Sequence, residues 1–263
     1  MNDYEALRDL AQRLAGRSHW PEGDAYSEIT VLAKDRDLIA LVLREDNDKP
    51  FASLLWAAST PAALLSLTAA IDALDQALVT TLPGKMGEIK PWQRVLEELG
   101  FGLKDLHIDM RLGTLQPMPE APLVRMALQS ELMDLVAIER VGIGVQGSHS
   151  PSELRERLVS SNGAVLALET PDKRVAGLIT GELYGPQRDS LFLRSMSVIP
   201  DERGKGYGRQ LAHAFINWGI SLGARKSMLW LNDINNKVAR QLYESVGYRA
   251  NGGVEAEYRY RPK

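Results

Sequence analysis

Hydrophobic and polar residues recur along the second half of the chain in a pattern that predicts a mixed α/β structure. Short apolar runs are typical of strands, and they lie at residues 123–128, 163–169, 174–185, 190–198, 226–231 and 254–261. Helical spacing of three and four residues separates them at 130–142, 150–160, 208–223 and 236–247. The predicted order is β-α-α-β-β-β-α-β-α-β, with one sheet flanked by helices.

Local signals mark the ends of two of these helices. Ser150 is a favourable N-cap, Pro151 follows it at the first helical position, and Glu153 completes a capping box. Gly247 is the residue at which the last helix is predicted to end. These signals support the helical interpretation independently of the apolar spacing.

A proline-rich segment divides the chain into unequal parts. Residues 113–122 contain three prolines and little periodicity, which indicates a linker between a domain at 1–112 and a domain at 123–263. The first part repeats the later portion of the second, with strands predicted at 27–34, 37–45, 51–59 and 106–112 and helices at 61–78 and 90–101. A repeat of this length predicts two copies of one domain. The first copy has Ser-Thr-Pro at 59–61 where the second has a glycine-rich loop, so we expect it to be degenerate.

Composition and charge narrow the classes of function. The chain has 263 residues, a net charge of −3 and no cysteine, so nucleic-acid binding is not supported and thiolate chemistry is excluded. The histidines at positions 19, 107, 149 and 213 share no metal-ligand spacing, so no metal is expected. The N-terminus lacks the apolar run of a signal peptide, and the uncharged stretch 51–71 is broken by Pro61. We interpret that stretch as a strand, a break and a helix, and expect a cytoplasmic protein with no membrane partner.

Residues 203–209, Arg-Gly-Lys-Gly-Tyr-Gly-Arg, lie between a predicted strand and a predicted helix. Glycine permits positive φ angles and a close approach of the backbone to a ligand. Backbone N–H groups that converge at a helix N-terminus, beside basic side chains, are typical of a phosphate site. The spacing matches neither a Walker loop nor a dinucleotide fingerprint. From this loop alone, a glycine-rich turn without a ligand stays an open alternative.

Three segments, in order, resemble the GCN5-related N-acetyltransferases, the GNAT family. Residues 203–208 fit the family signature R/Q-x-x-G-x-G/A, residues 196–202 resemble the exit of its fourth strand, and residues 236–248 resemble its N-x-x-A-x-x-x-Y-E-x-x-G-F/Y motif. The resemblance covers nearly all of residues 123–263. It implies a tandem GNAT-type acyl-CoA N-acyltransferase fold, with a mixed, mostly antiparallel sheet, a splayed parallel pair and flanking helices. The layout with a degenerate first copy is similar to that of mycothiol synthase-like members.

The resemblance also implies roles for individual residues. The loop would hold the pyrophosphate of acetyl-CoA through Arg203, Gly204, Lys205, Gly206, Tyr207, Gly208 and Arg209. The pantetheine arm would pair with the backbone of Met196, Ser197 and Val198 between two splayed strands, where an N–H would polarise the thioester carbonyl. Asn236 could contact the arm or cap its own helix, and Asn232 is a second candidate for the same contacts.

Acid and base candidates complete the predicted site. The resemblance implies that Tyr243 is the general acid for the leaving thiolate, since a phenol keeps its proton at neutral pH. The alternative is a tyrosine packed in the core with its hydroxyl satisfied. The strand at 190–198 lacks the glutamate that often serves as base in this family, so Glu182 on the neighbouring strand is the candidate base. Glu182 could equally be a structural or solvated carboxylate.

These features predict an N-acetyltransferase that moves the acetyl group of acetyl-CoA directly to a primary amine. The CoA site is expected in the second domain, with a small-molecule or peptide amine as acceptor. No metal or nucleic-acid partner is expected, and the chain is predicted to act as a monomer, with a homodimer left open. The alternatives are a non-catalytic CoA-binding sensor or scaffold and a nucleotide-binding protein of an unrelated α/β fold.

Overall fold

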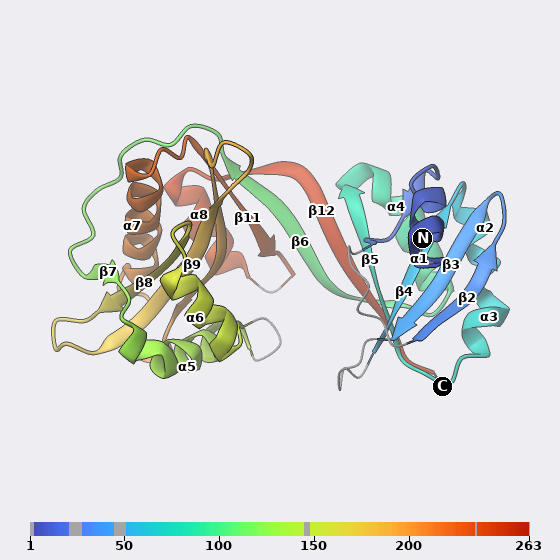
Figure 1. Cartoon of the computed structure of the whole chain (residues 1–263), viewed down its shortest axis with the longest axis horizontal. Coiled ribbons are helices and arrows are strands. Elements are labelled where there is room, and N and C mark those ends of the chain that lie inside the picture. Colours follow the sequence, from blue (N-terminus) through green and yellow to red (C-terminus); the bar gives the residue numbers. More distant parts are fainter. Residues whose placement is uncertain (1–2, 21–27, 45–50, 145–147, 235, 263) are drawn as a thin grey trace. The chain divides into compact units, whose positions relative to one another are not determined.

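The chain forms two compact units in the computed structural model, which describes residues 3–20, 28–44, 51–144, 148–234 and 236–262 (Figure 1). Unit 1 contains Met1–Ile108, Asn232–Asn235 and Gly252–Lys263. Unit 2 contains Asp109–Leu231 and Asn236–Asn251. Each unit therefore combines segments that are distant in the sequence.

The helices and strands follow one another along the chain, with the labels of Figure 1. The first half contains α1 (Asp3–Ala11), β1 (Gly16–Arg17), β2 (Glu28–Lys34), β3 (Leu38–Arg44), β4 (Ala52–Ala58), α2 (Pro61–Leu65), α3 (Thr68–Asp72), β5 (Leu78–Lys85), α4 (Met86–Glu98) and β6 (Gly102–Leu112). The second half contains β7 (Val124–Met126), η1 (Gln129–Glu131), α5 (Leu132–Ile143), α6 (Pro151–Val159), β8 (Gly163–Glu169), β9 (Val175–Tyr184), β10 (Ser190–Val198), η2 (Pro200–Glu202), α7 (Tyr207–Ser221), β11 (Lys226–Asn232), α8 (Lys237–Val246) and β12 (Arg249–Tyr260).

The predicted order of elements in the second half is confirmed from β7 to β12. The predicted capping box of α6 is also present: the Glu153 N–H donates to Ser150 Oγ at 3.3 Å, and the Ser150 N–H donates to Glu153 Oε2 at 2.7 Å. α8 ends at Val246 and is capped by Gly247, which has a φ of 110° and the left-handed conformation that favours glycine. Local sequence signals therefore place these helix ends correctly.

The single helix predicted over residues 61–78 is wrong. Two short helices, α2 and α3, occupy part of this range, and β5 begins at Leu78. The hydroxyls of Ser66 and Thr68 each donate to a carbonyl three residues earlier, Ala63 and Leu65, at 2.7 Å. Such side-chain bonds compete with the helical backbone pattern and favour a break. The uncharged stretch 51–71 begins with strand β4 and a break, as predicted, but α2 and α3 follow in place of one helix. None of the described helices is both long and apolar enough to span a membrane.

The sheet of unit 1 has the strand order β2-β3-β4-β5-β12. β2, β3 and β4 pair antiparallel, whereas β4 and β5 are parallel and pair at Ala52–Leu78 and Ser53–Val79. β12, red in Figure 1, then pairs antiparallel with β5 from Gly253–Lys85 to Tyr260–Leu78. The last strand of the chain thus belongs to the sheet of the N-terminal unit.

This pairing predicts a stability effect at the far end of the sequence. We expect Tyr258→Ala to lower the free energy of unfolding of unit 1 by about 3 kcal/mol, because Tyr258 is fully buried and its removal leaves a cavity beside β5. Hydrogen exchange of the β3 and β4 amides in urea measures the change. Glu255→Ala, at a half-buried position of the same strand, is the matched control. Unchanged protection of β3 and β4 in the Tyr258 variant would contradict the prediction.

The sheet of unit 2 has the strand order β6-β11-β10-β9-β8-β7 and is antiparallel from β7 to β10. α7 covers one face, because a Cβ added at Gly181 of β9 would overlap the ring of Phe215. The opposite face packs against α5 and α6 through a buried cluster of Leu132, Leu135, Val136, Ile138, Leu154, Val165, Ala167 and Leu178. Helices therefore cover both faces of a mixed sheet, as the sequence predicts.

Candidate functional site

The glycine-rich loop connects η2 to α7 in unit 2. Gly204 and Gly206 have φ angles of 79° and 82°, which other residues rarely adopt, and a Cβ added at either position would meet nothing within 4 Å. A Cβ at Gly208 would instead lie 2.7 Å from Leu242 Cδ1 of α8. The first two glycines thus shape an open backbone turn, whereas the third permits close packing between α7 and α8.

The loop presents a row of backbone donors. Within the described part of the chain, the N–H groups of residues 204–208 have no hydrogen-bond acceptor, and Gly206 caps α7 without a side-chain bond. The N–H groups of Arg209 and Gln210 are the first that bond to a carbonyl of the turn, that of Gly206, at 3.1 and 3.3 Å. Unpaired N–H groups at a helix N-terminus, together with the helix dipole, favour an anion.

Basic side chains flank this row of donors. Arg203 Nε donates to the Val198 carbonyl at 2.9 Å, so its guanidinium lies at the end of β10. Lys205 pairs with the buried Glu202 at 2.8 Å, and this hydrogen bond raises the pKa of Lys205. Arg209 is exposed and has no carboxylate partner among the described residues. Its charge is therefore available to a ligand at the start of α7.

β10 and β11 separate beside the loop. They pair in parallel from Ser190–Lys226 to Leu193–Leu229, and then both continue without pairing to each other. A bulge at Arg194 shifts the register of β10 against β9, and beyond it residues 196–198 pair with β9. The edge of residues 196–198 that faces β11 is thus free of a strand partner, which provides backbone groups for an extended, amide-containing ligand.

Tyr243 lies on α8 and is 6% exposed. Its ring makes an edge-to-face contact with Tyr248, with 5.7 Å between the ring centroids. Burial raises the pKa of Tyr243 well above its usual value, so the hydroxyl keeps its proton at neutral pH. Among the described residues this hydroxyl has no hydrogen-bond partner, whereas the Tyr248 hydroxyl bonds to Ser227 Oγ at 2.6 Å. Tyr243 therefore differs from a core tyrosine whose hydroxyl is satisfied.

The two asparagine candidates have different surroundings. Asn236 is exposed at the N-cap position of α8, but its side chain makes no capping hydrogen bond. Asn232 belongs to unit 1, where its Nδ2 donates to Asp105 Oδ1 at 2.5 Å and its Oδ1 accepts from the Ile234 N–H at 3.3 Å. Both side-chain groups of Asn232 are thus engaged locally, whereas Asn236 is left for a ligand. Their roles in binding stay predictions.

Glu182, the base candidate from sequence, is held by two guanidinium groups. Its Oε2 lies 2.7 Å from Arg157 Nη1, and its Oε1 lies 2.5 Å from Arg194 Nη2. Burial raises the pKa of Glu182, but the hydrogen bonds from Arg194 and Arg157 outweigh it and the net shift is downward. A carboxylate with a lowered pKa and both oxygens engaged is a weak proton acceptor. The catalytic role of Glu182 stays a prediction that these contacts do not favour.

Sequence reasoning missed a buried polar cluster on the α5 side of the same sheet. Glu139 of α5 is 0% exposed and accepts hydrogen bonds from His149 and from Ser195 of β10. Ser195 Oγ also lies 2.9 Å from Thr180 Oγ1 of β9. The sequence signal for this cluster was the position of Glu139 on the apolar stripe of its helix. Glu139 lies three residues after Val136 and four after Leu135, which are both buried.

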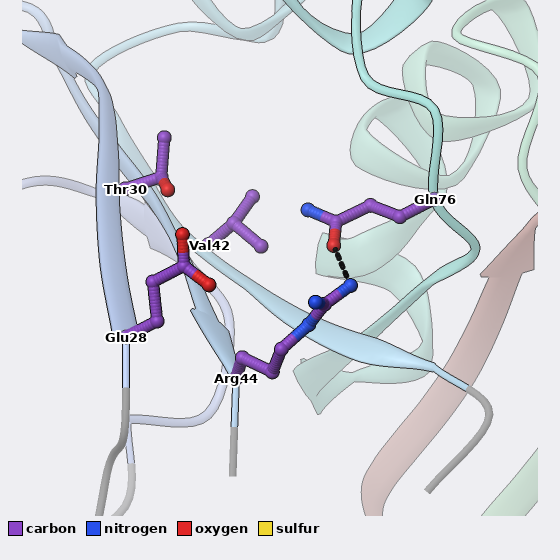
Figure 2. Close-up of a pocket in the computed structure, with 5 residues that line it drawn as sticks. All are labelled: Glu28, Thr30, Val42, Arg44 and Gln76. Carbon is purple, nitrogen blue, oxygen red and sulfur yellow. Dashed lines mark hydrogen bonds between the residues drawn. The ribbon is translucent and has the colours of Figure 1, made fainter.

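The first half offers no comparable anion site at the corresponding helix. Thr60 caps α2, its Oγ1 accepting from the Ala63 N–H at 3.2 Å, and Pro61 has no N–H to give. Unit 1 does contain a small pocket of about 80 Å³, which Figure 2 shows between β2, β3 and Gln76. Arg44 Nη2 donates to Gln76 Oε1 there at 2.9 Å. This volume is far below the several hundred Å³ of a typical cofactor pocket.

Comparison with known proteins supports the fold assignment. The family model "Acetyltransferase (GNAT) family" matches residues 133–248. A GCN5-related N-acetyltransferase structure from Sphaerobacter thermophilus is 11% identical with a TM-score of 0.61, covering 86% of this chain and 81% of its own. One from Kribbella flavida is 15% identical with a TM-score of 0.55, covering 99% and 95%.

A third solved structure has two such domains in one chain. The tandem GNAT protein from the clavulanic acid biosynthesis pathway is 10% identical, with a TM-score of 0.56, and the match covers 85% of this chain and 78% of that one. The search of curated proteins finds no match. Together with the mixed sheet and its splayed parallel strands, the family match shows that residues 133–248 form a domain of the acetyltransferase (GNAT) family.

Proposed function

We propose that this protein transfers the acetyl group of acetyl-CoA to a primary amine, and that the CoA site lies in the C-terminal half. The observation that carries the proposal is the row of unpaired N–H groups at residues 204–208, next to the point where β10 and β11 separate. Such donors suit a pyrophosphate, and the free edge of β10 suits the two amides of a pantetheine arm. The exposed guanidinium of Arg209 adds positive charge at the same helix end.

The proposed domains follow the sequence boundaries. Residues 123–263 would supply the acetyltransferase domain, residues 113–122 the linker, and residues 1–112 a degenerate copy without the glycine loop. The exchange of segments between the compact units modifies this scheme, since β12 lies in the sheet of unit 1 and residues 109–112 of β6 lie in unit 2. Neither sequence copy, residues 1–112 or residues 123–263, therefore coincides with a compact unit that could fold alone.

Different residues of the site would have different roles in acetyl transfer. Backbone N–H groups of residues 196–198 would hold the thioester carbonyl and stabilise the negative charge that develops on its oxygen. Tyr243, which keeps its proton and has no internal partner, would donate to the leaving sulfur. The acceptor is proposed to be a small-molecule or peptide amine.

A two-step experiment tests the proposal. Isothermal titration calorimetry with acetyl-CoA, ATP and NAD is expected to show binding of acetyl-CoA alone. A panel of amines, including polyamines, amino acids and peptides with free N-termini, is then assayed by release of the CoA thiol. Binding of acetyl-CoA with no acetylation of any amine would favour a CoA sensor or scaffold instead. Binding of ATP or NAD in place of acetyl-CoA would overturn the proposal.

The number of acetyl-CoA molecules bound per chain follows from the difference between the N-termini of α7 and α2. We expect one acetyl-CoA per chain, because the N-terminus of α7 has free donors, whereas Thr60 occupies a donor of α2 and Pro61 removes another. Calorimetry measures the number directly. The control variant Thr60→Ala, which removes the cap of α2, should bind with unchanged stoichiometry. Two equivalent sites in the wild-type chain would contradict the prediction.

A further inference from the structure

Glu139 is a buried carboxylate that the proposed transfer leaves without a role. It is 0% exposed, and an ionised carboxylate is costly to bury unless hydrogen bonds compensate it. Its Oε1 accepts from the ring Nδ1 of His149 at 2.8 Å and from Ser195 Oγ. Its Oε2 accepts from the backbone N–H of His149 at 2.9 Å. Burial raises the pKa of Glu139, but these hydrogen bonds outweigh it and lower the pKa below its ordinary value. Glu139 is thus an anion at neutral pH.

The contact with this anion determines the form of the His149 ring. A carboxylate only accepts, so Nδ1 of His149 must carry the proton, and Nε2 of the neutral ring then carries a lone pair. The side chain is 14% exposed, and Nε2 has no partner among the described residues. The arrangement leaves a partly accessible, oriented imidazole nitrogen that can accept a proton.

Hydrogen bonds attach this pair to the strand that carries the proposed thioester site. Ser195 donates to Glu139 and directly precedes residues 196–198, whose β11-facing edge is free. Thr180 of β9 lies 2.9 Å from Ser195 Oγ and extends the network to the next strand. The carboxylate is therefore fixed both to α5 and to the strand pair β9–β10.

We propose that His149 is the general base that accepts a proton from the acceptor ammonium group, and that Glu139 is the residue that positions it. The inference rests on the proposed acetyltransferase function. It assigns the base role to a ring with a free acceptor nitrogen. Glu182, by contrast, has both of its oxygens engaged by arginines.

The proposed step conserves atoms and charge. His149 Nε2 takes one proton from the ammonium, and the amine lone pair forms a C–N bond to the thioester carbonyl carbon. The C–S bond breaks, and the sulfur takes the proton of the Tyr243 hydroxyl. The second proton lost from nitrogen restores the Tyr243 phenol through solvent, and the His149 imidazolium releases its proton to solvent. The products are the N-acetyl amine, the CoA thiol and one proton.

Charged groups near His149 come from two helices. Glu139 contacts it from α5, and the carboxylate of Glu153 on α6 interacts with it electrostatically. The strand residues Ser195 and Thr180 carry hydroxyl groups, which stay uncharged at neutral and acidic pH. The carboxylates of Glu139 and Glu153 therefore favour the positive charge that the ring gains when it accepts a proton from the acceptor.

The test uses the full chain and the amine that gives the highest rate with acetyl-CoA. His149→Gln is expected to lower kcat by about 10²–10⁴-fold and to leave the Kd of acetyl-CoA unchanged, because a base acts on the amine. His107→Gln, at a half-buried histidine of unit 1, is the matched control and should keep wild-type kcat. In His149→Ala, added imidazole should restore part of the rate.

A second measurement determines directly which nitrogen of the His149 ring carries the proton. It uses the wild-type chain and so does not depend on how well the variants fold. A long-range ¹H–¹⁵N spectrum of the wild-type chain should show His149 protonated at Nδ1 and unprotonated at Nε2. Glu139→Gln should remove that preference, since an amide can also donate to Nδ1, and it should lower kcat as well.

The outcomes distinguish this inference from the function on which it depends. Wild-type kcat in a folded His149→Gln variant, or an Nε2–H ring in the wild-type spectrum, would overturn the base assignment and leave the acetyltransferase function standing. A wild-type chain that binds acetyl-CoA and acetylates no amine contradicts both. A loss of kcat in His149→Gln with rescue of His149→Ala by imidazole supports the assignment.

Discussion

Replacing Gly206 with valine should lower the affinity for acetyl-CoA by at least about 100-fold while the chain stays folded. Gly206 has a φ of 82°, and a β-branched residue would force the turn out of the conformation that aligns its N–H groups. Loss of two hydrogen bonds to a charged phosphate, at about 1.5–3 kcal/mol each, is sufficient for an effect of this size. Isothermal titration calorimetry gives the affinity.

Gly223→Val is the matched control for this substitution. Gly223 follows the other end of α7, has a φ of 93°, and a Cβ there would also meet nothing within 4 Å. The two variants therefore introduce similar backbone strain in similar open space, and their thermal unfolding should shift by similar amounts. If both bind acetyl-CoA as the wild type does, the loop at 203–209 is a turn without a ligand.

The second large effect is expected at Tyr243. Tyr243→Phe should lower kcat by about 10²–10⁴-fold and leave the Kd of acetyl-CoA nearly unchanged, because it removes the proton donor and keeps the ring contact with Tyr248. The hydroxyl has no internal hydrogen bond to lose among the described residues, so stability should be preserved. Steady-state kinetics and a thermal melt measure the two quantities.

Tyr248→Phe is the reverse case and serves as the control. Its hydroxyl bonds to Ser227 at 2.6 Å in the core, so the substitution should cost about 1 kcal/mol of stability and leave kcat near the wild-type value. If the Tyr243 variant keeps wild-type turnover, the general acid is water, and Tyr243 only packs in the core.

Features encoded by neighbouring residues could be predicted from the sequence. The apolar spacing gave the order of elements from β7 to β12, and Ser150, Glu153 and Gly247 marked the ends of α6 and α8. The glycine loop was also predictable in outline, because positive φ angles at Gly204 and Gly206 depend on the residues at those positions. The different role of Gly208 was not, since it depends on Leu242 of another helix.

Features that depend on distant segments could not be predicted in this way. Glu139 interrupts an apolar stripe, which marks it as unusual, but its partners are a histidine ten residues later and a serine on β10. From the sequence, Glu182 could be a base or a structural or solvated carboxylate, and the two contacts that distinguish these roles come from Arg157 and Arg194 on other elements. No local sequence signal predicts that β12 pairs with β5 in unit 1, because any apolar strand of suitable length could pair there.

The pairing of β5 with β12 has a consequence for biosynthesis. Leu78 pairs with Tyr260, so the sheet of unit 1 cannot be completed until residues 253–260 have left the ribosome. Contacts between residues so far apart in sequence slow folding, and until they form, β5 exposes an unpaired edge that can recruit another chain. During synthesis, the first half of this protein is thus expected to depend on chaperones for longer than its position in the sequence suggests.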